Sequence, residues 1–278
     1  MSGRRFTEVD VFATGAFTGN PLAVIHDADG LDDARLADIA RWTNLSETTF
    51  LLPPTDPAAD YRVRIFTGTG ELPFAGHPTL GTCHAWLAAG GTPKGDVVVQ
   101  QCGIGLVPVR VDADWLAFAA PALRRSGPVE TEVMSRIVAA LRADPADVVD
   151  AAWIDNGPGW VGVRMASGRA VLGLEPDPGL MAGITVGVVG PADAGEDHDV
   201  EVRAFYCPGA SVLEDPVTGS ANAGLAVWLI DAGVLPPRYV ARQGTRVGAD
   251  GRVEVQRVGG DTWIGGAVRT IVTGTITA

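Results

Sequence analysis

The chain has 278 residues, of which 21 are Lys or Arg and 33 are Asp or Glu, so its formal net charge at pH 7 is −12. An acidic chain without a basic stripe argues against binding to nucleic acid or to an anionic membrane surface. No apolar run is long enough to span a bilayer, and no signal-peptide pattern precedes the first strand-like segment. We therefore expect a cytoplasmic protein with one large or two medium domains.

Hydrophobic periodicity predicts many short strands and few helices. In the first half, strands are expected at 6–13, 22–25, 48–52, 61–66, 97–101, 106–111 and 115–119, and helices at 31–42 and 77–89. In the second half, helices are expected at 129–141, near Leu180 and at 220–232, and strands at 148–154, 161–165, 171–173, 185–189, 200–205, 239–243, 252–256 and 262–276. This order predicts an α+β fold in which a mixed sheet curls around one central helix in each half.

The candidate metal ligands and nucleotide motifs carry little signal. Cys83, Cys102 and Cys207 are odd in number and widely spaced, which argues against a disulfide framework and a zinc site. The acidic stretch 27–33 lacks the ligand spacing of a calcium loop, and 196–199 is predicted to be a solvated turn. No G-x-G-x-x-G follows a strand and no P-loop motif occurs. The sequence therefore predicts neither a metal nor a nucleotide cofactor.

One phrase occurs twice along the chain, at an offset close to half its length. The segments 71–81 (ELPFAGHPTLG) and 214–224 (EDPVTGSANAG) share a Glu, a Pro and two Gly at matching positions. A strand-like stretch precedes each copy, at 63–66 and 202–205. The repeat predicts two pseudo-symmetric domains with the chemistry in a cleft between them. The alternative is an old duplication whose glycines now serve only tight turns.

Local physics predicts how each copy is built. Pro73 and Pro216 are tolerated only ahead of a helix, and Gly76 and Gly219 permit a tight turn and close backbone approach. A helix start presents unpaired N–H groups and a partial positive charge. Two such starts in one cleft would make an anion site suited to a carboxylate.

Several segments together resemble the PhzF family, the phenazine-biosynthesis-type isomerases. They occur in order along nearly the whole chain, at 9–12 with 19–24, 44–48, 73–79, 214–221, 243–244 and 264–266. The resemblance implies a diaminopimelate-epimerase-like fold, with an N-terminal half at 1–122 to which strands at about 264–278 return, and a C-terminal half at 123–263. It also implies a homodimer that needs no cofactor.

The resemblance implies a catalytic set of Glu47, His77, Asp215 and Ser220. Glu47 would carry the proton with a raised pKa at the rim of the core. The helix start would lower the pKa of His77 and keep it neutral. Asp215 and Ser220 would orient the substrate and share the proton network. From position alone, the same residues read as an exposed Glu after a helix, a turn-capping His, a helix-dipole partner and an N-cap.

The expected substrate-binding residues share a place in these motif segments, and they are Gly76, Gly219, Asn20, Thr218 and Gln243. The N–H groups at the two helix starts would hold the carboxylate and the developing negative charge. Asn222 stands where a smaller residue would be more ordinary, and it would contact the ligand or only cap the turn.

The implied reaction is an isomerisation. Glu47 would move a proton within a small unsaturated carboxylated metabolite that resembles trans-2,3-dihydro-3-hydroxyanthranilate. An epimerase or racemase that uses Glu47 and Asp215 is a second hypothesis. The two-thiol version is disfavoured because Cys83 lies about two turns into its helix and Cys207 lies well before the second glycine. A non-catalytic small-molecule binding protein is a third hypothesis.

Overall fold

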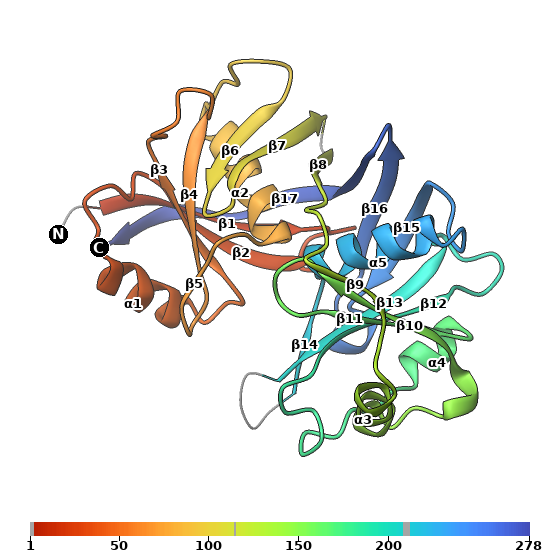
Figure 1. Ribbon diagram of the computed structural model, residues 1–278. Helices are drawn as coiled ribbons and strands as arrows, with labels where there is room; N and C mark the ends of the chain where they lie inside the picture. The colour runs from red at the N-terminus through yellow and green to blue at the C-terminus, as the bar shows by residue number, and fades with distance from the viewer. Residues whose placement is uncertain (1–2, 114, 208–211) are drawn as a thin grey trace. The chain divides into compact units, whose positions relative to one another are not determined.

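The computed structural model describes residues 3–113, 115–207 and 212–278 (Figure 1). The chain forms two compact units: unit 1 comprises Met1–Ala119 with Gly265–Ala278, and unit 2 comprises Ala120–Ile264. Both are rich in strands and contain few helices, which confirms the α+β prediction. Within the described residues, no helix has the length and apolar character needed to cross a membrane.

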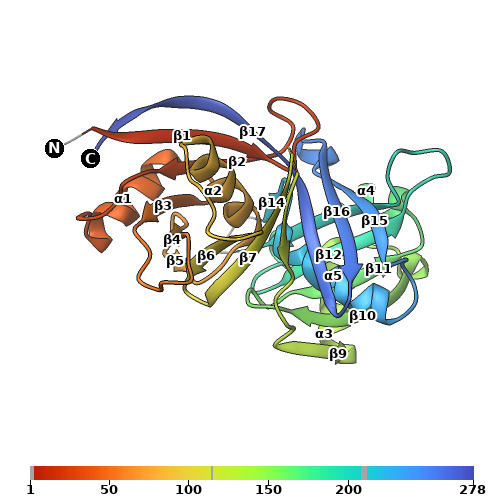
Figure 2. The same cartoon turned by 90° about the horizontal axis from the view of Figure 1, so that it is seen from above.

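Unit 1 is a sheet with one helix on each face. Its elements are β1 (Gly3–Val11), β2 (Asn20–Ile25), α1 (Asp33–Thr43), β3 (Thr48–Leu52), β4 (Tyr61–Phe66), β5 (Glu71–Leu72), α2 (Gly76–Ala88), β6 (Val98–Cys102), β7 (Gly105–Asp112), β8 (Trp115–Ala119) and, from Gly265 on, the rest of β17 (Asp261–Thr277). Strand β17 pairs with β1, and Gly3 lies opposite Thr277, so the two ends of the chain lie side by side (Figures 1 and 2).

Alternation along β3 separates the two faces of this sheet. Phe50 packs with Leu36 and Ile39 of α1, whereas the hydroxyl of Thr49 accepts a hydrogen bond of 2.8 Å from Thr82 of α2. Viewed from above, α2 lies between β1 and the strands β3, β4 and β6 (Figure 2). The predicted central helix of the first half is therefore α2, and α1 covers the outside.

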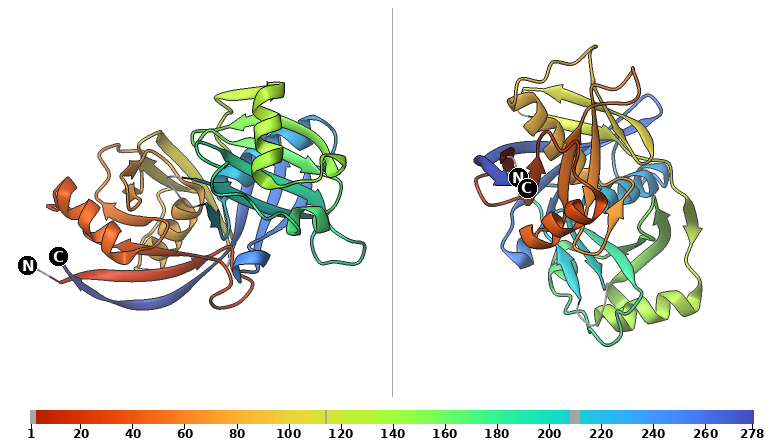
Figure 3. Two further views of the ribbon diagram at one scale, coloured as in Figure 1. Left: turned by 90° about the horizontal axis from the view of Figure 1, so that it is seen from below. Right: turned by 90° about the vertical axis from the view of Figure 1, so that its left-hand side faces the viewer.

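Unit 2 repeats this plan with an additional helix. Its elements are β9 (Arg125–Pro128), α3 (Thr131–Leu141), η1 (Pro145–Asp147), β10 (Val148–Asp155), β11 (Val161–Met165), α4 (Gly168–Leu172), β12 (Thr185–Pro191), β13 (Val200–Tyr206), β14 (Leu213–Asp215), α5 (Gly219–Asp231), β15 (Arg238–Gln243), η2 (Thr245–Val247), β16 (Gly251–Val258) and the start of β17. Helices α3 and α5 lie on opposite faces of the β10–β12 strands (Figure 3).

Strand alternation explains this arrangement too. Val161 and Val163 of β11 pack in one apolar cluster with Ile137 and Leu141 of α3. Between them, Gly162 faces α5, since a Cβ there would lie 3.0 Å from the Trp228 ring. The predicted central helix of the second half is α5.

The pairing pattern is the same in both units. In unit 1, β1–β2, β3–β4, β4–β5 and β6–β7 are antiparallel, and β2–β3 and β4–β6 are parallel. In unit 2, β10–β11, β12–β13, β13–β14 and β15–β16 are antiparallel, and β11–β12 and β13–β15 are parallel. Helices α1 and α4 occupy matching places in this order, as do α2 and α5. The repeated phrase is thus one part of a repeated topology, which confirms the pseudo-symmetry.

The second glycine of each repeat lets the central helix approach its sheet closely. A Cβ on Gly81 would lie 2.6 Å from Leu22 and 2.9 Å from Val9. A Cβ on Gly224 would lie 2.5 Å from the backbone oxygen of Ile154. Distances under about 3 Å are steric clashes. At Gly224 the clash is with the backbone, so a larger residue would displace the helix, whereas at Gly81 the clashing atoms are side-chain methyl groups that would have to shift.

Two local predictions were wrong. Residues 171–173 do not form a strand, because Ser167 caps a short helix through a hydrogen bond from Ala170 N and buried Val171 lies within that helix, α4. No helix forms near Leu180, where the chain makes a turn. In both places a short apolar run has no periodicity that distinguishes strand from helix or turn.

Candidate active site

In unit 1, Glu47 and His77 lie next to each other. Helix α1 ends at Asn44, whose left-handed conformation (φ 57°) turns the chain toward β3, and Glu47 directly precedes that strand. His77 is the second residue of α2. Its Nε2 lies 3.6 Å from Glu47 Oε2, and the side chains are 4% and 16% exposed, respectively. A carboxylate and an imidazole therefore meet where they are largely shielded from water.

The imidazole of His77 is held neutral. Burial lowers its pKa to about 3, against a hydrogen bond with the Pro21 carbonyl that raises it. The direction is the predicted one, and its largest cause is desolvation of the ring. The amide nitrogen of Asn20 lies 3.5 Å from Nδ1, so Asn20 and Pro21 border one side of the ring and Nε2 is directed at Glu47. A neutral imidazole can donate or accept a hydrogen bond at that point.

The position of Asn20 depends on a buried carboxylate that sequence reasoning did not assign to the site. Asp10 is 3% exposed, and its two oxygens accept hydrogen bonds from Thr18 N at 2.9 Å and Gly19 N at 3.0 Å. Gly19 passes so close to β1 that a Cβ would lie 2.2 Å from the Val11 carbonyl oxygen. Asp10 thereby holds the turn that leads into Asn20.

In unit 2, Asp215 is bound to a buried amide network. Thr218 Oγ1 donates a hydrogen bond of 2.6 Å to Asp215 Oδ2. Gln243, which is fully buried, donates to the Asp215 carbonyl at 3.0 Å and to Thr218 Oγ1 at 2.9 Å, and accepts from Thr218 N at 3.0 Å. Asn222 Nδ2 donates to Gln243 Oε1 at 2.8 Å and to the Thr218 carbonyl at 2.9 Å. Asn222 is therefore part of the support of Asp215, a role that its sequence position did not reveal.

Ser220 is oriented by an aromatic side chain. The indole N–H of Trp160, which is 4% exposed, donates a hydrogen bond of 3.0 Å to Ser220 Oγ. Asn156 Nδ2 donates to the Ser220 carbonyl at 2.8 Å. Because the indole can only donate, the Ser220 hydroxyl accepts from Trp160 and directs its own proton elsewhere. Neither Trp160 nor Asn156 is in a motif segment. The sequence indicated Trp160 only as an aromatic candidate for a pocket wall or the core, and it did not indicate Asn156.

The two helix starts are not capped by side chains. The N-cap residues are Ala75 for α2 and Thr218 for α5, and neither makes a side-chain capping hydrogen bond. Thr218 uses its hydroxyl on Asp215 instead. His77 and Ser220 are each the second helical residue, so they are not the caps that the simpler interpretation expected. First-turn N–H groups without a side-chain cap suit an anionic ligand.

Each unit thus contains part of the predicted set. The residues that meet within a unit are Glu47, His77 and Asn20 in unit 1, and Asp215, Thr218 and Gln243 in unit 2. Ser220 lies on α5, and its side chain contacts Trp160. Gly76 and Gly219 are the first residues of the two helices, and neither has a positive φ. The thiol of Cys83 lies within α2, where burial raises its pKa to about 12, so it is unsuited to proton abstraction at neutral pH.

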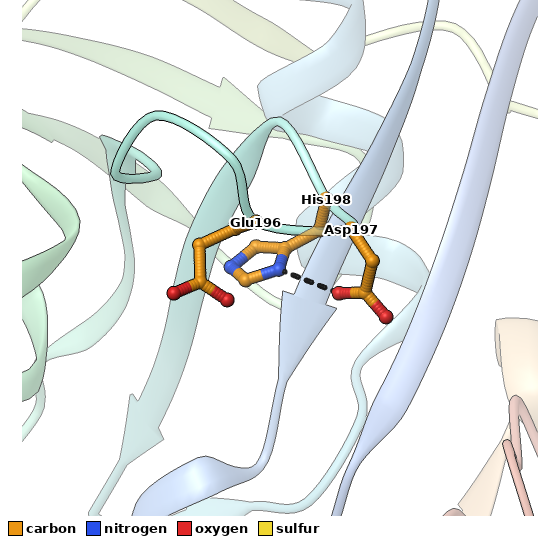
Figure 4. Close-up of side chains that lie close together, drawn as sticks. All are labelled: Glu196, Asp197 and His198. Carbon is orange, nitrogen blue, oxygen red and sulfur yellow. Dashed lines mark hydrogen bonds and ion pairs between the residues drawn. The ribbon is translucent and has the colours of Figure 1, made fainter.

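Glu196, Asp197 and His198 form a cluster whose candidate ligand atoms lie within 4.8 Å of one another (Figure 4). Arg252 Nη2 binds both oxygens of Asp197, at 2.9 and 3.0 Å. His198 is 8% exposed, and its ring nitrogens lie 3.1 Å from Asp197 and 3.4 Å from Glu201. Three residues of the predicted turn 196–199 are exposed, but His198 is buried. The contacts tie the loop before β13 to β16.

Comparison with known proteins identifies a family with this architecture. The family model for phenazine biosynthesis-like proteins matches residues 9–274. The chain is 34% identical over 298 residues to antisense-enhancing sequence 1 of Schizosaccharomyces pombe, with 99% of each chain covered. It is 34% identical over 265 residues to the trans-2,3-dihydro-3-hydroxyanthranilate isomerase of Pseudomonas aeruginosa, with 92% of this chain and 91% of the relative covered.

Solved structures share the fold. A phenazine biosynthesis protein of the PhzF family from Enterococcus faecalis superposes with a TM-score of 0.81 at 24% identity, with 100% of both chains covered. A hydroxyproline epimerase from Agrobacterium vitis gives a TM-score of 0.59 at 17% identity, with 99% of this chain and 92% of that chain covered. These likenesses extend the fold match from PhzF proteins to an epimerase.

Proposed function

The chain is an isomerase of the phenazine-biosynthesis-like PhzF family, and we propose that it moves a proton, without a cofactor, within a small unsaturated metabolite that carries a carboxylate. The observation that carries this proposal is the pair of Glu47 and neutral His77, whose facing atoms are 3.6 Å apart at an uncapped helix start. A compound like trans-2,3-dihydro-3-hydroxyanthranilate is the proposed substrate, because curated relatives such as the Pseudomonas aeruginosa protein act on it.

Glu47 carries the proton in the proposed mechanism. Its carboxylate removes a proton from an activated carbon, and the electron pair left behind spreads into the conjugated system and its carboxylate. The protonated Glu47 then returns the proton to another carbon of that system, so the double bond shifts and the atoms balance. Because His77 is neutral, it can accept a hydrogen bond from protonated Glu47 and hold that carboxyl in place without adding a charge. General acid–base catalysis of this kind contributes about 10²–10⁴-fold.

The residues of unit 2 act on the same substrate molecule in this proposal. Ser220 is the second residue of α5, which corresponds to α2 in the repeated topology, and Asp215 ends the strand β14 that precedes this helix. Trp160 orients the hydroxyl of Ser220, and Thr218 orients the carboxylate of Asp215. They orient the substrate, and the helix N–H groups stabilise its negative charge. Asn20, Thr218 and Gln243 complete the proposed substrate-binding set.

The same proposal includes a homodimer, a cytoplasmic location, a biosynthetic role and domains at 1–122 with 264–278 and at 123–263. Resemblance to the family supports these points. Sedimentation of the purified protein measures the dimer directly, and a mass of one chain of 28.8 kDa at micromolar concentration would contradict it.

Proton exchange tests the mechanism. Wild type and Glu47→Gln are incubated with trans-2,3-dihydro-3-hydroxyanthranilate in D₂O, and NMR follows deuterium incorporation and double-bond movement. The Gln side chain keeps the shape of Glu47 but cannot take up a proton, so we expect exchange to fall by at least about 10²-fold. Exposed Glu132→Gln on α3 is the matched control and should retain wild-type exchange.

The outcomes separate the hypotheses. Equal exchange in wild type and Glu47→Gln would refute Glu47 as the proton carrier. Deuterium at a stereocentre without double-bond movement would favour epimerisation. Tight binding of the compound by both proteins with no exchange in wild type would favour a binding protein.

A further inference from the structure

The end of helix α2 opposite His77 borders a second pocket within unit 1. The 13 residues of α2 extend over about 20 Å, so this pocket is well separated from the Glu47–His77 pair. Its volume is about 420 Å³, and Ala89, Gly90 and Gly91 form part of its wall just after the helix ends. This volume is in the range of pockets that bind small molecules.

The interior of the pocket combines an aromatic wall with one buried polar group. Trp86 stacks on Tyr61 with ring centroids 5.3 Å apart, and Leu51 lies beside them in the lining. His26 is 5% exposed, and its Nε2 lies 3.0 Å from Thr7 Oγ1. Its Nδ1 has no hydrogen-bond partner among the described side chains and backbone groups. Burial lowers the pKa of His26, so the ring offers a neutral polar nitrogen to the pocket.

Among the residues that the structure describes, four charged side chains line the pocket, and they form no salt bridge with one another. Arg5, Asp27 and Asp29 line it and are exposed. Within the described residues, none of the three takes part in a salt bridge, and the guanidinium of Arg5 makes only a long bond of 3.4 Å to the Ala89 carbonyl. Arg5 lowers and Asp27 raises the pKa of His26, so both charges act on the same ring. The fourth charged group, Asp60, accepts hydrogen bonds from Lys94 N and Val99 N.

We propose that this pocket binds a free amino acid with an apolar side chain. A purely anionic ligand would face Asp27 and Asp29 in a chain of net charge −12, and a purely cationic ligand would leave Arg5 unpaired beside a like charge. A zwitterion places its carboxylate at Arg5 and its ammonium at the two carboxylates. The apolar side chain then packs on half-buried Trp86, where burial of apolar area favours binding.

Three probes of matched shape test this assignment. ¹⁵N-labelled full-length protein is titrated with L-phenylalanine, with phenethylammonium, which lacks the carboxylate, and with 3-phenylpropanoate, which lacks the ammonium. The indole N–H of Trp86 reports occupancy. Because each charge-assisted contact is lost with its group, we expect the zwitterion to bind at least about tenfold more tightly than either analogue.

Variants identify which side chain of the protein binds each charged group of the ligand. Arg5→Gln should remove the preference for L-phenylalanine over phenethylammonium, and Asp27→Asn combined with Asp29→Asn should remove the preference over 3-phenylpropanoate. Asp27 has φ 52°, a conformation that Asn tolerates well, so its backbone should persist. Exposed Arg269→Gln and Asp96→Asn are the matched controls and should change neither preference.

The proposal is independent of the isomerase chemistry, so Glu47→Gln should bind L-phenylalanine as wild type does. Three results would overturn it. The first is equal affinity for the zwitterion and one analogue. The second is that no probe shifts the Trp86 signal up to about 10 mM, which corresponds to negligible affinity. The third is that Glu47→Gln abolishes binding.

Discussion

The buried amide of Gln243 makes four hydrogen bonds that hold the second repeat together. Gln243→Leu removes an oxygen that accepts hydrogen bonds from Thr218 N and Asn222 Nδ2, while Gln243 itself is fully buried. Two buried N–H groups then lose their acceptor, the backbone N–H of Thr218 and one of the two on Asn222 Nδ2, at about 1–3 kcal/mol each. We therefore expect Gln243→Leu to lower the free energy of unfolding by about 2–6 kcal/mol.

Urea unfolding followed by tryptophan fluorescence measures this loss, and hydrogen exchange at α5 locates it in unit 2. A double-mutant cycle with Asn222→Leu sharpens the test. Asn222→Leu removes one of the two stranded donors, so the double variant should be more stable than additivity predicts by about 1–3 kcal/mol.

A buried glutamine of unit 1 is the matched control. Gln100 is also fully buried, and its oxygen accepts a hydrogen bond from the Tyr61 hydroxyl. Gln100→Leu should destabilise the protein without changing hydrogen exchange at α5. A loss below about 1 kcal/mol for Gln243→Leu, or no coupling with Asn222→Leu, would refute the argument that stranded donors determine the energetics here.

Three further predictions rest on single contacts. Trp160→Phe removes the N–H that orients Ser220 Oγ, so kcat for the proposed isomerisation should fall about tenfold, the worth of one hydrogen bond; an unchanged kcat with an intact fold would contradict the orienting role. The pKa of His77 is about 3 in the folded state against 6.5 as its ordinary value, so the unfolded chain binds the proton more readily. The free energy of unfolding that neutral His77 contributes is fully present above pH 6.5 and is lost as the pH falls toward 3, by on the order of 1 kcal/mol per pH unit. Urea unfolding of wild type and His77→Asn at several pH values measures this loss. Parallel pH profiles of the two proteins would exclude a buried neutral His77. Gly224→Ala places a Cβ 2.5 Å from the Ile154 carbonyl, so the midpoint of urea unfolding should drop by an amount equivalent to about 1–3 kcal/mol; a midpoint equal to that of wild type would show that α5 can shift without cost.

Local patterns in the sequence determined where the two central helices begin. Pro73 and Pro216 followed by Gly76 and Gly219 predict helix starts at those glycines, and α2 and α5 begin there. The repeated phrase also indicated the internal symmetry, because a duplicated segment retains the strand and helix periods that specify its topology. The roles of Glu47, His77, Asp215 and Ser220 stay predictions until the variants are assayed.

Tertiary structure alone decided how the candidate residues are supported. The Trp160–Ser220 and Asn222–Gln243 hydrogen bonds join residues on different elements, and no local period records such a contact. The low pKa of His77 comes chiefly from burial of its ring in the folded chain. Similarly, Gly81 and Gly224 are needed because another strand passes within van der Waals distance of each helix. Periodicity in one segment reports which face is buried, whereas packing between segments sets what each buried atom contacts.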